Sequence, residues 1–244
     1  MNGPHDATEP PDLSSVPLFP LPGVVLFPRA VLPLHIFEER YKTMTADALR
    51  GRRQVAMALL RSGWERNYHH KPAIDPVVCV GRILSHEKLP DGKYNFLLQG
   101  VLRARIIREN GGGAGGAGGA GGAGLEDETP YRTARLEPLE ETPVPEVELE
   151  DERRLLHELF MTTPLGGIGA GRQFRQIVKA PLPTPVVADL AAFTFLEDVP
   201  LKQALLADVD VRHRVRRTVA ALQQVVATLP QAIYAPAPAD PRLN

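Results

Sequence analysis

Five prolines lie among bulky apolar residues in one stretch near the start of the chain, VPLFPLPGVVLFPRAVLPLHIFEERY (Val16–Tyr41). Proline fixes φ and lacks a backbone N–H, so this stretch cannot form one continuous central strand. Its apolar content is too high for a disordered linker. The pattern therefore predicts short strands that are broken by tight turns, one of them at Leu21–Gly23, and packed on a common core.

The composition is typical of a globular protein with either one large domain or two modest ones. Of 244 residues, 43% are hydrophobic and 23% are charged, and the net charge of −1 gives no overall attraction to nucleic acid or to an anionic membrane. The start of the chain lacks the features of a signal peptide, and no apolar run is long enough to cross a bilayer. Cys79 is the only cysteine, so no intrachain disulfide can form. These features predict a cytoplasmic protein without a membrane partner.

Strand patterns dominate the first 142 residues. A helix is predicted from Phe37 to Arg50, because Phe37, Tyr41, Met44 and Ala48 recur at helical spacing before a glycine. A long loop is expected over Ser62–Pro76, and Asp91-Gly92 favours a hairpin turn. The predicted strands are Gln54–Arg61, Val77–Ser85, Tyr94–Gly100, Val101–Glu109 and Tyr131–Leu139.

Helical patterns follow Pro145. We expect a helix over Val147–Met161, a loop at the glycine-rich Pro164–Gly171, and a helix that is capped by Thr184 with Pro185 in its first turn. A short helix over Pro200–Ala207 precedes a last helix that begins near Asp210. The apolar stripe of this last helix comprises Val211, Val215, Val219, Leu222 and Val226.

A near-perfect Gly-Gly-Ala repeat over Gly111–Gly124 separates the last two predicted strands. Glycine loses the most backbone entropy on ordering, so this tract is interpreted as a flexible insertion in a hairpin loop. The predicted organisation comprises a disordered leader (1–14), a β domain (15–142) with a flexible insertion (110–128), a helical bundle of four or five helices (143–232) and a flexible tail (233–244).

Several of these segments together resemble the N-terminal, substrate-binding domain of the Lon protease family. The match extends over roughly residues 13 to 230 and is most specific in the first hundred residues. The segments that resemble the family are Pro17–Pro28, Leu32–Tyr41, Ala58–Leu60, Cys79–Ile83, Leu89–Ile106, Val187–Phe193 and Leu201–Arg214.

The resemblance implies an α+β fold with a PUA-like β-pseudobarrel followed by a C-terminal helical bundle. It also implies recognition of polypeptide or of a partner protein, in a stand-alone form of this peptidase S16-like family that lacks the ATPase and peptidase domains. We therefore expect no enzymatic activity and no cofactor. The glycine–alanine insertion departs from the family pattern, as does the glycine-rich 162–184 segment, where the family has more helix.

The residues themselves give little support to catalysis. The segment Gly166–Gln173 has the glycine spacing of a phosphate loop, but Arg172 and Gln173 replace the required lysine and hydroxyl residue, and a helix precedes it. No hydrolase motif is present, and an acid–base pair of His35 with Glu38 is less plausible than a structural role. The potential ligands His69, His70, Cys79 and His86 match no common metal site, so none is predicted.

Aromatic and proline-rich residues are the candidates for peptide binding. Trp64 and Tyr68 lie in the long loop, where an exposed aromatic side chain could anchor an extended polypeptide. An alternative, in which Trp64 folds back and caps the barrel, remains open. The complete candidate set is Phe27, Pro28, His35, Phe37, Glu38, Arg40, Tyr41, Trp64 and Tyr68.

The alternative function is an RNA-binding PUA-like module, since such folds can bind RNA, and a small-molecule-binding regulator is a third possibility. The first basic group comprises Arg52, Arg53, Arg103, Arg105 and Arg108. A second group lies between Arg212 and Arg217. Neighbouring acidic residues and the lack of interleaved aromatic residues favour a solvated helix face for the second group. The residues indicate no particular oligomeric state.

Overall fold

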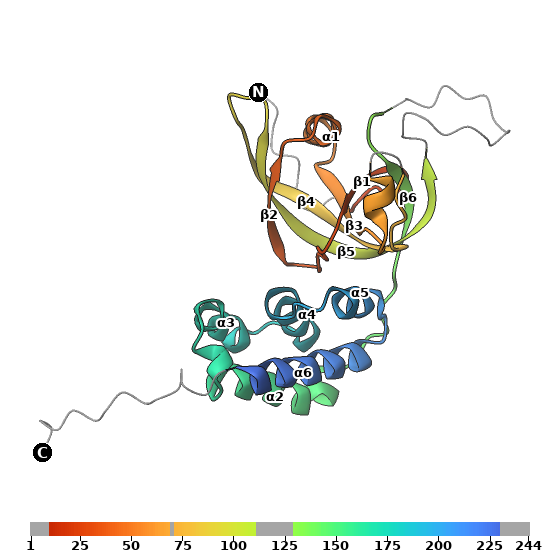
Figure 1. Cartoon of the computed structure of the whole chain (residues 1–244). Helices are drawn as coiled ribbons and strands as arrows, with labels where there is room; N and C mark the ends of the chain where they lie inside the picture. Colours follow the sequence, from red (N-terminus) through yellow and green to blue (C-terminus); the bar gives the residue numbers. More distant parts are fainter. Residues whose placement is uncertain (1–9, 69–70, 111–128, 230–244) are drawn as a thin grey trace, which may run out of the picture. The chain divides into compact units, whose positions relative to one another are not determined.

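The computed structural model describes residues 10–68, 71–110 and 129–229. The chain divides into two compact units, one built from the residues up to Glu140 together with Asp198–Val209, the other from Glu141–Glu197 and the residues from Asp210 onward. In chain order the strands come first and, apart from α1 between β2 and β3, the helices follow them (Figure 1), so the predicted α+β class is confirmed. The glycine–alanine tract, the predicted tail and most of the predicted leader lie outside the described residues.

The first unit is a six-stranded sheet that closes on itself. Its strand order is β2-β5-β4-β3-β1-β6, and β6 pairs with β5 as well as with β1. The first half of β5 pairs with β2, and its second half pairs with β6. The strands are β1 (Val16–Leu21), β2 (Val31–Ile36), β3 (Gln54–Leu59), β4 (Val77–Lys88), β5 (Tyr94–Asn110) and β6 (Thr133–Pro138).

The proline-rich opening forms two short strands, as predicted. β1 pairs in parallel with β3, and the chain then turns at Gly23, where φ is +71°. β2 contains Pro33 and has β5 as its neighbour in the sheet, so it forms an edge strand. A proline is tolerated at an edge because its missing N–H interrupts no ladder on the open side.

β5 is one strand of 17 residues, although the sequence pattern predicted two strands that meet at Gly100. The glycine is explained by a close approach of the backbone at Phe27, since a Cβ on Gly100 would lie 2.1 Å from the Phe27 carbonyl oxygen. The Arg29 N–H donates to the Gly100 carbonyl oxygen at 2.8 Å, and the Gly100 N–H donates to the Ala30 carbonyl oxygen at 2.9 Å. The 25–30 segment is thereby held against the middle of β5.

Helix α1 (Glu39–Arg50) follows β2 and ends at Gly51, as predicted. Tyr41, Met44 and Ala48 face the core, but Phe37 does not. It precedes the helix and its side chain is 61% exposed, so the prediction that placed it on the buried stripe was wrong.

The second unit is formed by helices that surround a cluster of phenylalanine rings. The ring centroids of Phe160, Phe174 and Phe195 lie 4.5 to 5.2 Å apart. The helices are α2 (Glu150–Met161), α3 (Gly169–Lys179), α4 (Thr184–Phe195) and α6 (Val211–Thr228), with short 3₁₀ turns η2 (Glu146–Leu149) and η3 (Pro164–Gly166). None of the helices in the described ranges is long and apolar enough to span a membrane.

The glycine-rich segment Pro164–Gly171 is not the predicted loop, and its glycines permit close packing of the backbone. Helix α3 already begins at Gly169, and η3 precedes it. A Cβ on Gly166 would lie 1.7 Å from the Phe160 carbonyl oxygen, and one on Gly171 would lie 1.8 Å from the Leu165 carbonyl oxygen. The glycines therefore let backbones approach closely, which explains their spacing without a bound phosphate.

The N-terminus of helix α4 is capped by a side chain that is distant in the sequence. Thr184 lies inside the helix after Pro183, so it is not the capping residue that the sequence predicted. The Glu146 carboxylate instead accepts a hydrogen bond from the Thr184 N–H at 2.8 Å and another from the Thr184 hydroxyl at 2.7 Å. A carboxylate at a helix N-terminus satisfies unpaired N–H groups and is favoured by the helix dipole.

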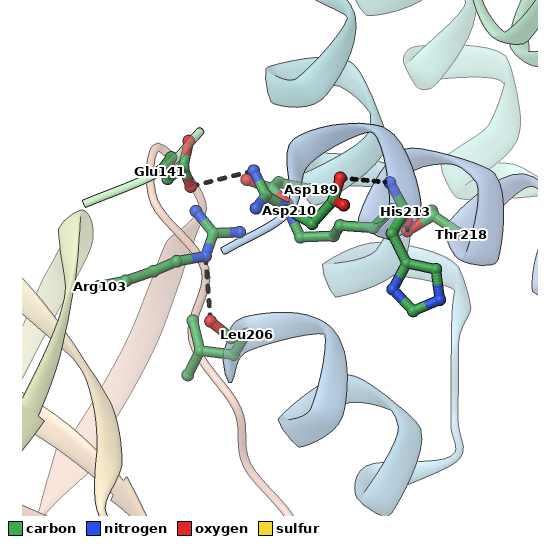
Figure 2. A network of polar contacts seen from close by, with 8 residues as sticks. Arg103, Glu141, Asp189, Leu206, Asp210, His213 and Thr218 are labelled. Carbon is green, nitrogen blue, oxygen red and sulfur yellow. Dashed lines mark hydrogen bonds and ion pairs between the residues drawn. The ribbon is translucent and has the colours of Figure 1, made fainter. Parts of the chain in front are cut away.

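Helix α5 (Val199–Ala207) groups with the sheet, although the sequence pattern assigned residues 143–232 to one bundle. It contacts β4, where the Gln203 side chain donates to the Val77 carbonyl oxygen at 2.9 Å. The Arg103 guanidinium of β5 donates to the Leu206 carbonyl oxygen at the end of this helix, at 3.1 Å (Figure 2). The chain thus returns to the first unit between α4 and α6.

Candidate functional site

The outward face of the sheet carries exposed apolar side chains where β2, β5 and β4 lie side by side. Pro33 pairs with Leu97, which pairs in turn with Ser85, and the next row joins His35, Asn95 and Glu87. Because side chains alternate along a strand, Val31, Pro33 and His35 share the outward face of β2. We define the outer sheet face by Val31, Pro33, His35, Phe37, Leu84 and Leu97.

This face is unusually apolar for a surface. Phe37, Leu84 and Leu97 are 61%, 46% and 40% exposed. A contiguous exposed apolar patch is typical of an interaction surface, whereas single exposed apolar residues need no explanation. A shallow pocket of about 420 Å³ hollows the face between the three strands. Its lining combines apolar residues, Pro33, Leu34, Phe96 and Leu97, with polar ones, His35, Ser85, His86, Glu87 and Asn95.

His35 holds Phe37 in place on this face. The His35 Nδ1 atom lies 2.7 Å from Asn95 Oδ1, which fixes the imidazole against the neighbouring strand. The rings of His35 and Phe37 are stacked, with centroids 6.2 Å apart and an interplanar angle of 29°. An exposed phenyl ring that is held this way loses little side-chain freedom when it contacts a partner.

Four other predicted candidates form a compact cluster at the start of α1. The Tyr68 hydroxyl donates to the Glu38 carboxylate at 2.5 Å, and Arg40 forms an ion pair with Glu38 at 3.0 Å. The Arg40 guanidinium also lies 4.5 Å from the Tyr41 ring centroid and 5.0 Å from that of Tyr68. The contacts tie the loop after β3 to the start of the helix.

Burial of this cluster changes the titration of its tyrosines. Tyr41 is 5% exposed, and burial raises its pKa to about 12. Burial also raises the pKa of Tyr68, and the hydrogen bond to the Glu38 carboxylate raises it further. Tyr41 is therefore a core residue and is not available for contact with a partner.

Three further candidates lie away from the outer sheet face. Phe27 is fully buried beneath Gly100, so it does not form part of an apolar surface, and Pro28 beside it is half-buried. Trp64 begins the 3₁₀ turn η1 (Trp64–Asn67), packs against the barrel core, and meets Tyr68 edge-on at 5.4 Å. It thus folds back as the alternative prediction proposed, while remaining partly accessible.

The sequence prediction brought only His35 and Phe37 to the outer sheet face. It missed Val31, Pro33, Leu84 and Leu97, which lie on three different strands. The alternation of VLPLHIF and YNFLLQG would have indicated which residues share a face. The pairing of Pro33 with Leu97 could not be read from either segment alone.

The described residues form no metal site. Nowhere in the described ranges do three His, Cys, Asp or Glu side chains lie close enough to hold an ion. Cys79 is buried in β4 and His86 lines the shallow pocket, while His69 and His70 fall outside the described residues.

The basic groups that supported the RNA alternative are largely used within the fold. Arg103 is only 4% exposed, so it cannot contribute to a basic surface strip. In helix α6, Arg214 is fully buried and pairs with Asp189 at 3.2 Å and with Glu141 at 2.9 Å. Arg212 and Arg216 pair with Glu148 and Glu152.

Comparison with known proteins gives consistent matches over most of the chain. The sequence profile described as the ATP-dependent protease La (LON) substrate-binding domain matches residues 15–224. A Lon protease from Dictyoglomus thermophilum is 26% identical over 207 residues, which cover 83% of this chain and 23% of that protein. The chain spans about a quarter or less of the length of the curated relatives it matches.

Two solved structures share the fold. The N-terminal domain of a Mycobacterium avium complex Lon protease has a TM-score of 0.60 and 17% sequence identity, covering 86% of this chain and 98% of that one. A Lon N-terminal domain protein from Xanthomonas campestris has a TM-score of 0.53 and 20% identity, covering 89% and 99%.

Proposed function

Because the chain belongs to the family of ATP-dependent protease La (LON) substrate-binding domains, we propose that it recognises polypeptide segments through the outer sheet face. The observation that supports this proposal is the set of exposed apolar side chains Phe37, Leu84 and Leu97, of which Leu97 also lines the shallow pocket. Unfolded polypeptides expose apolar side chains that folded proteins bury, so an apolar face discriminates between the two.

The contacts proposed for a bound segment follow from the chemistry of the face. Phe37 supplies a large apolar surface that is stacked on His35, and Pro33 and Leu97 supply apolar lining of the pocket. Asn95 and Ser85 in the same lining can exchange hydrogen bonds with the backbone of an extended segment. None of these contacts requires bond cleavage, so the proposed role is recognition without turnover, in the cytoplasm.

Binding of a permanently unfolded protein tests this role. We expect fluorescein-labelled β-casein to bind the full chain, and the variants Phe37→Ser and Leu97→Ser to raise the Kd about fivefold or more, because central apolar contacts dominate such interfaces. Fluorescence anisotropy measures the Kd. ATPase and peptidase assays on the same preparation are expected to show no turnover above background.

Ile107→Ser is the matched control. Ile107 lies on β5, as Leu97 does, and it is 52% exposed. It is not part of the outer sheet face. Its substitution removes a similar apolar area, so casein binding should remain as in the unmodified chain. Equal losses in all three variants, or no loss in the first two, would refute the assignment to this face.

A further inference from the structure

A second and larger pocket lies within the first unit, away from the outer sheet face. Its volume is about 1060 Å³, and its walls come from helix α5, from the turn at Pro22 and from the η1 loop with Trp64. No residue lines both this pocket and the shallow one. A hollow of this size accommodates several residues of an extended chain or a drug-sized molecule.

The wall that α5 provides is apolar and fixed in position. Val199, Pro200, Ala204 and Ala207 present small or apolar side chains to the pocket. The hydrogen bond from Gln203 to the Val77 carbonyl oxygen anchors the helix on β4, and its C-terminal end accepts from Arg103. A pre-formed wall lowers the entropic cost of binding.

Trp64 contributes both an apolar surface and a free donor. The indole packs against the barrel core, yet it is only partly buried and lines the pocket. Within the described ranges the indole N–H has no hydrogen-bond partner. Tryptophan N–H groups normally find an acceptor when they are covered, so a ligand at this position is expected to supply one.

Arg105 contributes the charge. It is exposed, it lines the pocket, and its guanidinium makes no hydrogen bond or ion pair within the part of the chain that the structure describes. By contrast, Arg61 in the same wall is paired with Asp75 at 3.3 Å. Guanidinium groups bind carboxylates through two parallel hydrogen bonds, which makes a carboxylate the complementary group.

We propose that this pocket is a second binding site, which takes an extended polypeptide segment with a carboxylate next to an apolar residue. The carboxylate pairs with Arg105, a backbone carbonyl of the segment accepts from the Trp64 N–H, and the apolar side chain packs on α5. Nucleic acid fits less well, because a nucleic-acid site needs several cations that can contact phosphates, whereas Arg61 in these walls is already paired with Asp75.

Trp64 is the only tryptophan in the sequence and lines the pocket, so tryptophan fluorescence reports whether the pocket is occupied. The probe is the synthetic peptide acetyl-Pro-Leu-Glu-Pro-Leu-amide, compared with the peptide in which glutamine replaces glutamate. We expect the glutamate peptide to produce a saturable change in tryptophan emission, with an affinity about fivefold or more above that of the glutamine peptide. The variant Arg105→Gln should abolish this preference.

Arg135→Gln is the matched control, because Arg135 is also exposed on a strand and has no partner within the described ranges. It should keep the preference for glutamate. Equal affinity of the two peptides for the unmodified chain, equal effects of the two arginine variants, or no emission change up to about 1 mM peptide would overturn the proposal. The two proposals are tested separately, because the peptide experiment changes Arg105 and leaves Phe37 and Leu97 intact. Failure of the peptide experiment would therefore leave casein binding at the outer sheet face unchanged.

Discussion

Arg214 has the largest side chain among those that the described residues bury completely. A guanidinium that is removed from water needs partners, and Asp189 and Glu141 supply them. Asp189 is itself only 4% exposed, so removal of Arg214 would take away the cation that pairs with a buried carboxylate. Residues from α4, from α6 and from the segment before η2 are thereby joined at one point.

The variant Arg214→Met should therefore lower the free energy of unfolding by about 3 to 5 kcal/mol, since it removes the cation that is paired with the buried Asp189 carboxylate. The double variant Arg214→Met, Asp189→Leu removes both charges and should recover part of this loss. Urea unfolding measures both values. A double variant that is less stable than the single one would contradict this account.

The tyrosine cluster predicts how stability responds to alkaline pH. The pKa of Tyr41 is raised to about 12 and that of Tyr68 is raised as well, so the folded chain favours the protonated forms. Their contribution is fully present below about pH 10, the pKa of an unfolded tyrosine, and is lost as the pH rises toward 12. Tyrosinate absorbance should show one tyrosine that titrates with a pKa of about 12. This titration step should be missing in the variant Tyr41→Phe. Unchanged titration in that variant would assign the late step to another tyrosine.

At the scale of elements, two nearby glycines should respond in opposite ways to the same substitution. Gly166→Ala should destabilise the second unit by about 2 kcal/mol or more, because the added methyl group meets the Phe160 carbonyl oxygen. Gly169→Ala meets no atom within 4 Å and should stabilise the chain by up to about 1 kcal/mol, since alanine is the better helix former. Thermal unfolding distinguishes the two variants, and similar effects would argue against close packing at Gly166.

The sequence predicted most elements whose signals are local. The short strands around the prolines, the hairpin at Asp91-Gly92 and the helix that follows Asp210 need only neighbouring residues to be recognised. The glycines at 166 and 171 were misread because their close neighbours, Phe160 and Leu165, are set by packing. Leu97 was missed for the same kind of reason, since strand register alone makes it a neighbour of Pro33.

At the scale of the molecule, the position of α5 in the chain limits how the first unit can be isolated. A chain that ends at Glu140 lacks α5, so the guanidinium of Arg103 loses the Leu206 carbonyl oxygen, and β4 loses its contact with the helix. We expect such a truncation to be less stable by about 1 to 3 kcal/mol or more, because a buried donor is left unsatisfied.

The control is the same truncation with residues 198–209 appended through a glycine–serine linker, which restores both contacts. Thermal unfolding of the two chains measures the difference. If the shorter chain melted at the same temperature as the extended one, α5 would contribute nothing to the sheet.

The return of residues 198–209 to the first unit also has a consequence for the evolution of the chain. Three peptide connections, after Glu140, Glu197 and Val209, join the two units. A single recombination event therefore cannot exchange one unit for a foreign counterpart without dividing the other. The two units are expected to descend together through duplication and transfer, as one heritable block.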